Sequence, residues 1–198
     1  MRKILVPILT IVLAAVILLG LYNGLNEERF VYEMHDLQEK MEAMLPGSKV
    51  FTPEEYTGED SNIHRVWKAD TGYIVETITY GYAGNIRMLI GVHNDGNVTG
   101  LQIRDMEETY GLGAEALKDW EFLAQFLNKG GNFTVATHGA DASSSATGDT
   151  TAAAGEEIEV DALTGATVTS KAIARSVNSA VGFVTGADAS SAATSWGG

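Results

Sequence analysis

Cysteine is absent from the 198-residue chain. The sequence therefore excludes disulfide bonds, iron–sulfur clusters held by thiolates, c-type haem attachment, a catalytic thiolate and a lipid anchor on an N-terminal cysteine. The four histidines, His35, His64, His93 and His138, stand far apart and show no metal-ligand spacing. No nucleophile–base–acid set of side chains is apparent either. Redox or group-transfer chemistry would thus depend on an organic cofactor, or on hydroxyl and carboxylate side chains.

Basic residues are few, because 13 Lys and Arg stand against 26 Asp and Glu, which gives a net charge of −13. A chain this acidic is a poor partner for nucleic acid, whose phosphates must be neutralised by Lys and Arg. Hydrophobic residues make up 45% of the chain, which argues against wholesale disorder. The length suits one modest domain with accessory segments.

Charge is missing altogether from residues 4–25, which are mostly Ile, Leu, Val and Ala. As a helix this stretch would be about 33 Å long, enough to cross the core of a bilayer. Pro7 falls in the first turns, where a missing amide costs least. A cleaved signal peptide is the alternative, but its apolar region would be shorter, and Gly20-Leu21-Tyr22 is a weak cleavage site. The sequence predicts a retained transmembrane anchor over residues 1–25.

The charges that flank this anchor predict its direction. Arg2 and Lys3 precede it, whereas Glu27 and Glu28 follow it. The positive-inside rule then keeps the N-terminus in the cytoplasm and sends the rest of the chain across. We expect a single-pass protein of the cell (inner) membrane whose domain lies on the extracytoplasmic side.

Beyond the anchor, apolar residues recur at three- and four-residue steps, at Phe30, Met34, Leu37, Met41 and Met44. This spacing predicts an amphipathic connecting helix over residues 26–47, ended by Pro46-Gly47. The domain itself is expected over residues 48–184. Within it, residues 137–155 consist largely of Ala, Ser, Thr and Gly and predict a flexible insertion, and residues 185–198 predict a flexible tail.

Secondary-structure patterns in this domain are mixed. Alternating apolar and polar residues predict strands at 64–68 and 73–80. Strands at 86–93 and 98–104 are expected on either side of a turn, and further strands are expected at 133–136 and 158–160. Asn94-Asp95-Gly96-Asn97 is typical of a hairpin turn. Helices are expected at 114–118, 120–127 and 171–184. These elements predict an α+β fold, with a mainly antiparallel twisted sheet against which the helices pack.

The segment from Asp161 to Ser170, between a predicted strand and the last helix, is the sharpest local signal. Gly165 and Ala166 allow a tight turn and the approach of a bulky group. Hydroxyls and free amides follow at the helix N-terminus, on Thr167, Thr169 and Ser170. Such a terminus favours phosphate binding. The alternative is a plain strand-to-helix connection with a Thr or Ser N-cap.

This segment resembles the flavin-attachment motif of the FMN-binding domain family, D-x-x-[ST]-G-A-T. In that family the last Thr is joined to FMN by a phosphoester bond. The resemblance implies that Thr167 carries covalent FMN and that Asp161 is recognised by a flavin transferase. It also implies cofactor contacts from the neighbouring residues Leu163, Thr164, Gly165, Ala166 and Val168.

A second motif precedes it in family order. The segment from Glu108 to Gly113 is similar to the family's flavin-contacting loop, E-T-x-G-L-G, with Tyr110 where Pro is usual. The resemblance implies further cofactor contacts from Glu108, Thr109, Gly111, Leu112 and Gly113, with Leu112 against the flavin ring. Tyr80–Ile86 looks like the family's Gly-rich strand entry, and Asn94–Ile103 like its hairpin, so the likeness covers residues 73–184.

The order of anchor, helix and domain resembles the G subunits of Rnf complexes, which are ion-translocating ferredoxin:NAD oxidoreductases. This implies an electron-relay subunit of a translocase, without independent catalytic activity. Its partners would be the other subunits of the complex, the membrane and, during maturation, a flavin transferase. Three alternatives stay open: the C subunit of the sodium-translocating NADH:quinone reductase, a structural or solute-binding module without flavin, and a stand-alone extracellular flavoprotein reductase.

Overall fold

A computed structural model describes residues 12–18, 35–107, 119–136 and 157–187 of the chain. The chain divides into two compact units, Met1–Lys40 and Met41–Gly198. Of the predicted anchor, the structure describes residues 12–18, and these are helical. Within the described stretches, no helix combines the length and apolar character that a membrane crossing requires.

The structure describes only the second half of the expected connecting helix. Residues 35–44 are helical, and the chain turns directly afterwards at Pro46-Gly47. Gly47 has a φ of +95°, a value that residues with a side chain rarely adopt. The predicted residues 26–34 of this helix lie outside the described part.

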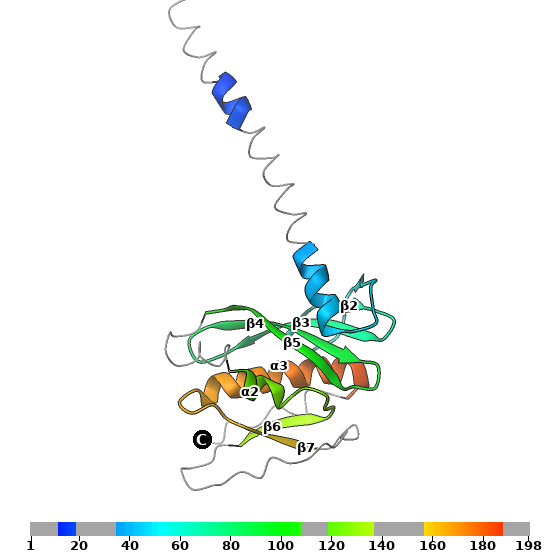
Figure 1. The fold of residues 1–198 in the computed structure, drawn as a ribbon. Helices are drawn as coiled ribbons and strands as arrows, with labels where there is room; N and C mark the ends of the chain where they lie inside the picture. Colours follow the sequence, from blue (N-terminus) through cyan, green and yellow to red (C-terminus); the bar gives the residue numbers. More distant parts are fainter. Residues whose placement is uncertain (1–11, 19–34, 108–118, 137–156, 188–198) are drawn as a thin grey trace, which may run out of the picture. The chain divides into compact units, whose positions relative to one another are not determined.

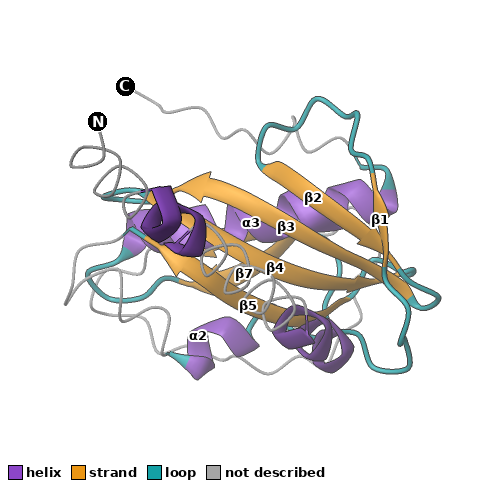
Figure 2. Ribbon diagram, turned by 90° about the horizontal axis from the view of Figure 1, so that it is seen from above, coloured by secondary structure: helices purple, strands orange, loops and turns teal. Residues whose placement is uncertain are grey.

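The second unit contains a five-stranded antiparallel sheet in the order β1-β2-β3-β4-β5 (Figures 1 and 2). The strands are β1 (Thr52–Glu54), β2 (Ile63–Lys68), β3 (Gly72–Tyr80), β4 (Asn85–His93) and β5 (Val98–Met106). Sequential antiparallel order needs only short connections between neighbours. The predicted mainly antiparallel sheet is therefore confirmed, with β1 added at its edge.

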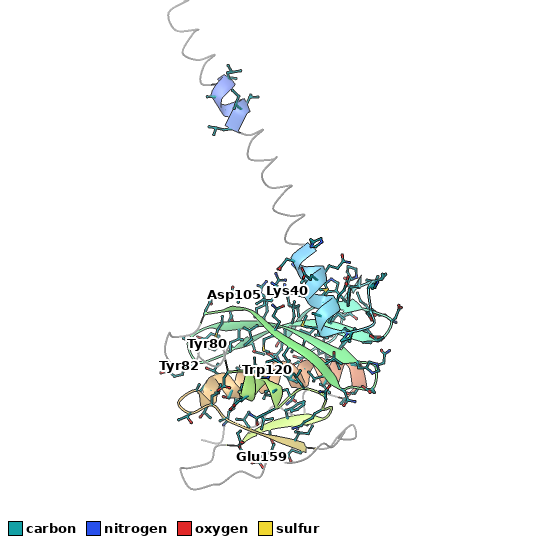
Figure 3. The ribbon with its side chains drawn as sticks, in the orientation of Figure 1. Lys40, Tyr80, Tyr82, Asp105, Trp120 and Glu159 are labelled. Carbon is teal, nitrogen blue, oxygen red and sulfur yellow. The ribbon has the colours of Figure 1, made fainter. Side chains whose placement is uncertain are left out.

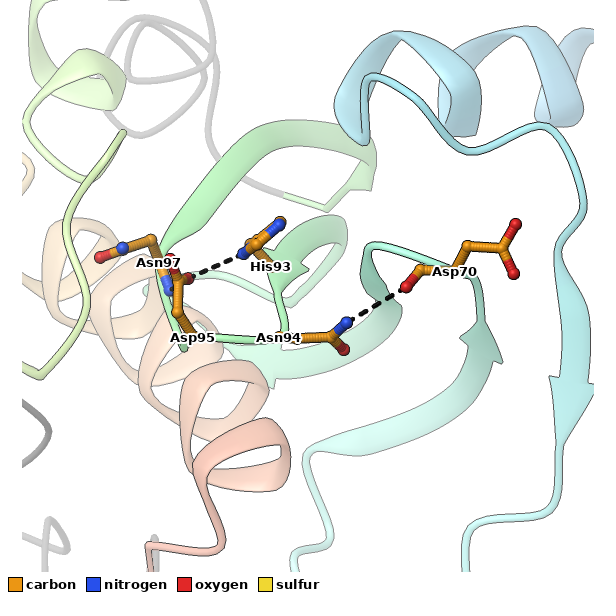
Figure 4. A network of polar contacts seen from close by, with 5 residues as sticks. All are labelled: Asp70, His93, Asn94, Asp95 and Asn97. Carbon is orange, nitrogen blue, oxygen red and sulfur yellow. Dashed lines mark hydrogen bonds and ion pairs between the residues drawn. The ribbon is translucent and has the colours of Figure 1, made fainter.

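The turn between β4 and β5 is the hairpin that the sequence predicts. Gly96 has a φ of +89°, and the carboxylate of Asp95 accepts a hydrogen bond from the backbone N–H of Asn97 at 3.0 Å. The same carboxylate lies 3.1 Å from Nδ1 of His93 (Figure 4). Burial alone would raise the pKa of Asp95, but the hydrogen bonds from Asn97 and His93 outweigh it and hold that pKa below its ordinary value of 3.8.

Two further strands form a separate pair. β6 (Asn132–Ala136) and β7 (Glu157–Asp161) pair in parallel, with Phe133 opposite Ile158 and Val135 opposite Val160. Both strands were expected from the sequence, but their parallel pairing was not. The helix α2 (Trp120–Ala124) comes just before β6 and is shorter than the predicted helix 120–127.

The last helix, α3 (Thr167–Thr185), lies between the five-stranded sheet and the β6–β7 pair (Figure 1). On the sheet side, Oγ1 of Thr79 lies 2.8 Å from Oγ of Ser176. On the other side, the amide of Asn178 accepts from the N–H of Phe133 at 2.8 Å and donates to its carbonyl at 2.9 Å. A helix covered on both sides needs apolar or small residues almost all round.

The core of this unit lies where α3 meets the two sheets. The buried side chains come from every layer: Val75, Ile86, Met88, Ile90, Phe126, Phe133, Val160, Ile173, Val177 and Val181. The prediction that α3 begins at residue 171 is wrong, because the helix begins at Thr167. The Thr, Val and Ser residues at 167–170 obscured this first turn in the sequence, since they are weak helix formers.

Candidate functional site

The segment singled out by the sequence connects β7 to α3. β7 ends at Asp161, and α3 begins at Thr167. Between them, the N–H of Ala166 donates to the carbonyl of Leu163 at 3.0 Å and closes a turn. Gly165 lies in this turn with a φ of +77°, so the tight turn predicted there is confirmed. We call residues 161–167 the attachment loop.

The start of α3 is open toward an anion. The N-cap residue is Ala166, and within the described residues no side chain caps this helix end. The first backbone N–H groups of a helix have no acceptor within the helix, and the helix dipole is positive there. The first turn also contains no acidic residue. The expected alternative of a Thr or Ser N-cap is therefore not observed, and the residues present fit a phosphate group.

The three hydroxyl-bearing residues in the first turn of α3 differ in their exposure to solvent. Thr167 is half-buried, whereas Thr169 is 1% exposed and Ser170 is completely buried. Val168 is 38% exposed beside Thr167. Of the three hydroxyls that the sequence placed at this helix end, only that of Thr167 can accept a bulky group without a rearrangement of the core.

Ser170 has a different role from the one predicted. Its Oγ accepts a hydrogen bond from the N–H of Leu163 at 3.1 Å and donates one to the carbonyl of Ala166 at 3.0 Å. Its own N–H donates to the same carbonyl at 2.9 Å. Neither its hydroxyl nor its amide is left for an anion. Ser170 instead ties the first turn of α3 to the attachment loop.

A second set of hydrogen bonds to the attachment loop comes from the end of α2. Oε1 of Gln125 accepts a hydrogen bond from the N–H of Asp161 at 2.8 Å, and Nε2 donates to the carbonyl of Asp161 at 3.5 Å. Gln125 is the C-cap residue of α2. Sequence analysis missed this residue, because nothing local indicates that a glutamine contacts a residue 36 positions later.

The predicted flavin-contacting loop, residues 108–113, lies outside the described residues, as does the predicted helix 114–118. The chain enters this stretch at Glu107, whose N–H donates to the carbonyl of Asn85 at 3.0 Å. A Cβ on Gly84 would lie 2.6 Å from the Cβ of Glu107, so the turn between β3 and β4 is pressed against this entry point.

That turn lies at the same end of the domain as the start of α3. Tyr73 at one end of β3 stacks edge-on against Phe183 near the end of α3, with ring centroids 5.5 Å apart. At the other end of β3, Oγ1 of Thr79 donates to the carbonyl of Ala172 at 3.2 Å. β3 therefore runs antiparallel to α3. The exposed side chains of Tyr80 and Tyr82 continue past Thr79 (Figure 3).

Comparison with known proteins identifies similar chains. Residues 81–182 match the family described as FMN-binding domain, a range that includes both motifs. The G subunit of the ion-translocating oxidoreductase complex of Methanosarcina acetivorans is 30% identical over an alignment of 198 positions that covers 92% of this chain and 93% of that protein.

Two further relatives match over a shorter range. The G subunit of the Na(+)-translocating ferredoxin:NAD(+) oxidoreductase complex of Acetobacterium woodii is 38% identical over 111 residues, 56% of this chain and 47% of that protein. The G subunit of the proton-translocating ferredoxin:NAD(+) oxidoreductase complex of Clostridium ljungdahlii is 37% identical over 114 residues, 57% of this chain and 53% of that protein. The aligned part thus spans about half the length of these two relatives.

Proposed function

The chain belongs to the FMN-binding domain family, and on that basis we propose that it carries FMN on Thr167 and relays electrons as a G subunit of an ion-translocating oxidoreductase complex. The observation that carries this proposal is the partly exposed Thr167 at the start of α3, where no side chain among the described residues caps the helix. The relatives named as G subunits support the assignment to such a complex.

The proposed link is a phosphoester, and its formation can be written as a balanced exchange. Oγ of Thr167 forms a bond to the phosphorus of the FMN moiety, while a phosphoanhydride bond of an activated flavin dinucleotide breaks. A nucleoside monophosphate leaves, and the proton of the hydroxyl is released. A flavin transferase would catalyse this step and recognise Asp161, whose side chain is exposed at the end of β7.

The chain's own residues then hold the phosphate and leave room for the rest of the group. The free N–H groups and the positive end of the α3 dipole stabilise the negative charge beside Thr167. Gly165 carries no side chain, and it is exposed together with Thr164, which keeps the approach open. Bound FMN supplies one- and two-electron redox chemistry, which the protein itself lacks.

Further cofactor contacts are part of the proposal. Leu163, Ala166 and Val168 flank the attachment site within the described structure. From the loop that precedes α2, the contacts are those implied by the family motif: Glu108, Thr109, Gly111, Leu112 and Gly113. The described residue next to this stretch, Glu107, lies against Gly84 at the end of β3 that faces the start of α3.

We propose membrane attachment on the strength of residues 4–25, which carry no charge. The flanking charges then give a single pass through the cell (inner) membrane, with the N-terminus in the cytoplasm and the FMN domain outside it. A covalent tether suits that side, because a dissociable cofactor would be diluted away there. The electron-exchange partners are the other subunits of the complex.

A pair of isosteric substitutions tests the attachment residue. Thr167→Val removes the accessible hydroxyl, and Thr169→Val removes a buried hydroxyl of the same helical turn, which makes it the matched control. Each full-length variant is produced with a flavin transferase, denatured, and examined for flavin fluorescence in the gel band. We expect fluorescence in the wild type and in Thr169→Val but none in Thr167→Val. Fluorescence retained by Thr167→Val would place the link elsewhere.

A further inference from the structure

The side chain of Gln125 holds one residue of the attachment loop from both sides. It accepts from the N–H of Asp161 at 2.8 Å and faces the carbonyl of the same residue at 3.5 Å. When the N–H and the C=O of one residue are both held, the direction of its Cα–Cβ bond is set as well. Gln125 thus helps to fix the direction in which the side chain of Asp161 leaves the backbone.

Further hydrogen bonds of the attachment loop come from β6, from α3 and from the loop itself. The N–H of Ala162 donates to the carbonyl of Ala136 in β6 at 3.1 Å. Leu163 and Ala166 are tied to Ser170 in α3. Gln125 adds hydrogen bonds to this loop from outside β6, β7 and α3.

The contact between Gln125 and Asp161 also links the two family motifs, because of where α2 lies in the chain. α2 begins directly after residues 108–118, which contain the second family motif. Asp119 fixes the start of α2, because its carboxylate accepts from the N–H of Phe122 at 3.1 Å. The rings of Phe122 and Phe126 pack edge-on in the core, with centroids 5.4 Å apart, and anchor the helix. Gln125 therefore connects the segment after one motif to the first residue of the other.

We propose that Gln125 is a positioning residue for flavin attachment, which orients Asp161 and the loop behind it for the flavin transferase. This role rests on the function proposed above. Gln125 is not a catalytic residue in this proposal, since it acts only through the backbone of Asp161. The short bond from the Asp161 N–H carries most of the effect, because the opposite contact, at 3.5 Å, is at the limit of a hydrogen bond.

The chain contains a matched control for this arrangement. Asn178 holds Phe133 by the same pair of contacts, with its Oδ1 accepting from the N–H at 2.8 Å and its Nδ2 donating to the carbonyl at 2.9 Å. That clamp also joins a helix to a strand, but it lies three turns along α3 from Thr167. Substitution of Gln125 or of Asn178 removes the same type of side-chain-to-backbone hydrogen bonds. Only the bonds of Gln125 are made to the attachment loop.

Three full-length variants separate positioning from general stability. Gln125→Met keeps the length of the side chain and removes both contacts. Gln125→Glu keeps the acceptor for the Asp161 N–H, and Asn178→Leu removes the control clamp. Each is produced with the flavin transferase, and the fraction of chain carrying covalent FMN is followed over time by intact mass. Hydrogen exchange is measured at the amides of Asp161 and Phe133 in protein made without the transferase.

We expect Gln125→Met to slow attachment about three- to tenfold, the factor that one ordinary hydrogen bond supplies, with faster exchange at the Asp161 amide. Gln125→Glu keeps the acceptor for the Asp161 N–H but turns a carboxylate oxygen toward the Asp161 carbonyl, so its attachment rate should lie between those of the wild type and Gln125→Met. Asn178→Leu should leave the attachment rate unchanged, although the Phe133 amide exchanges faster.

Two results would overturn this role alone: attachment at the wild-type rate in Gln125→Met, or equal slowing in Asn178→Leu. Attachment as slow in Gln125→Glu as in Gln125→Met would also contradict it, because the acceptor would then not matter. A wild-type chain that stays unmodified would overturn the proposed function itself, and the positioning role with it.

Discussion

The hydroxyl oxygen of Ser170 lies 3.1 Å from the backbone nitrogen of Leu163, so the first turn of α3 accepts a hydrogen bond from the loop that leads into it. The same hydroxyl donates to the carbonyl of Ala166. Because Ser170 is completely buried, water cannot replace these bonds. The attachment loop is thus braced from the core while its tip, Thr164 and Gly165, stays exposed.

Replacement of this hydroxyl tests the brace. Ser170→Ala leaves the N–H of Leu163 without its acceptor, and we expect the free energy of unfolding in urea to fall by about 1–3 kcal/mol. Thr164→Ala, on an exposed residue of the same loop, should change it by no more than about 0.5 kcal/mol. Equal stabilities of the Ser170 variant and the wild type would show that the brace does not contribute.

Because α3 lies between two sheets, we expect truncation of its buried side chains to lower the free energy of unfolding strongly. Ile173 is completely buried in the core shared by the two sheets. Ile173→Ala should lower the free energy of unfolding by about 2–5 kcal/mol, because it removes buried apolar surface and leaves a cavity. Lys171→Ala, on the exposed face of the same helix, should change it by no more than about 0.5 kcal/mol. A loss under about 1 kcal/mol for Ile173→Ala would contradict the layered core.

The hairpin turn predicts a dependence on acid. The folded-state pKa of Asp95 lies below its ordinary value of 3.8, chiefly because the hydrogen bonds from Asn97 and His93 outweigh the effect of burial. A depressed carboxyl pKa contributes stability at pH values above 3.8, and this contribution disappears as the pH falls through the folded-state pKa.

The measurement compares the wild type with Asp95→Asn by thermal unfolding across this range. We expect the wild type to have the higher melting temperature at neutral pH, and the difference to shrink as the pH falls below 3.8. The shift should be small, because the Asp95 side chain is 55% exposed. A difference that grows on acidification would reverse the sign and refute the assignment.

Much of the fold could be predicted because its signals are local. Asp95-Gly96 indicated the hairpin of β4 and β5, and period-two alternation indicated β2 and β3. The predicted ends of these four strands lie within one or two residues of the observed ends. The tight turn at Gly165 followed from the residue that supplies a positive φ. The resemblance to a family carried the remainder of the site assignment, and the family itself is confirmed.

The contacts that could not be predicted are long-range or run against local propensity. The parallel pairing of β6 with β7 joins strands separated by a long connection, and no pattern in either strand distinguishes parallel from antiparallel partners. The early start of α3 is stabilised by burial of residues with weak helix propensity. Gln125 reaches Asp161 only because the fold brings α2 beside the end of β7.

The central claim is the covalent link between FMN and Thr167, and peptide mapping of the native full-length chain tests it most directly. The protein is isolated from a host that contains the flavin transferase, digested, and the peptide ending at Lys171 is analysed by mass spectrometry. We predict that this peptide carries the mass of FMN on Thr167. An unmodified peptide from such a sample would contradict the claim, and the proposed electron relay would fail with it.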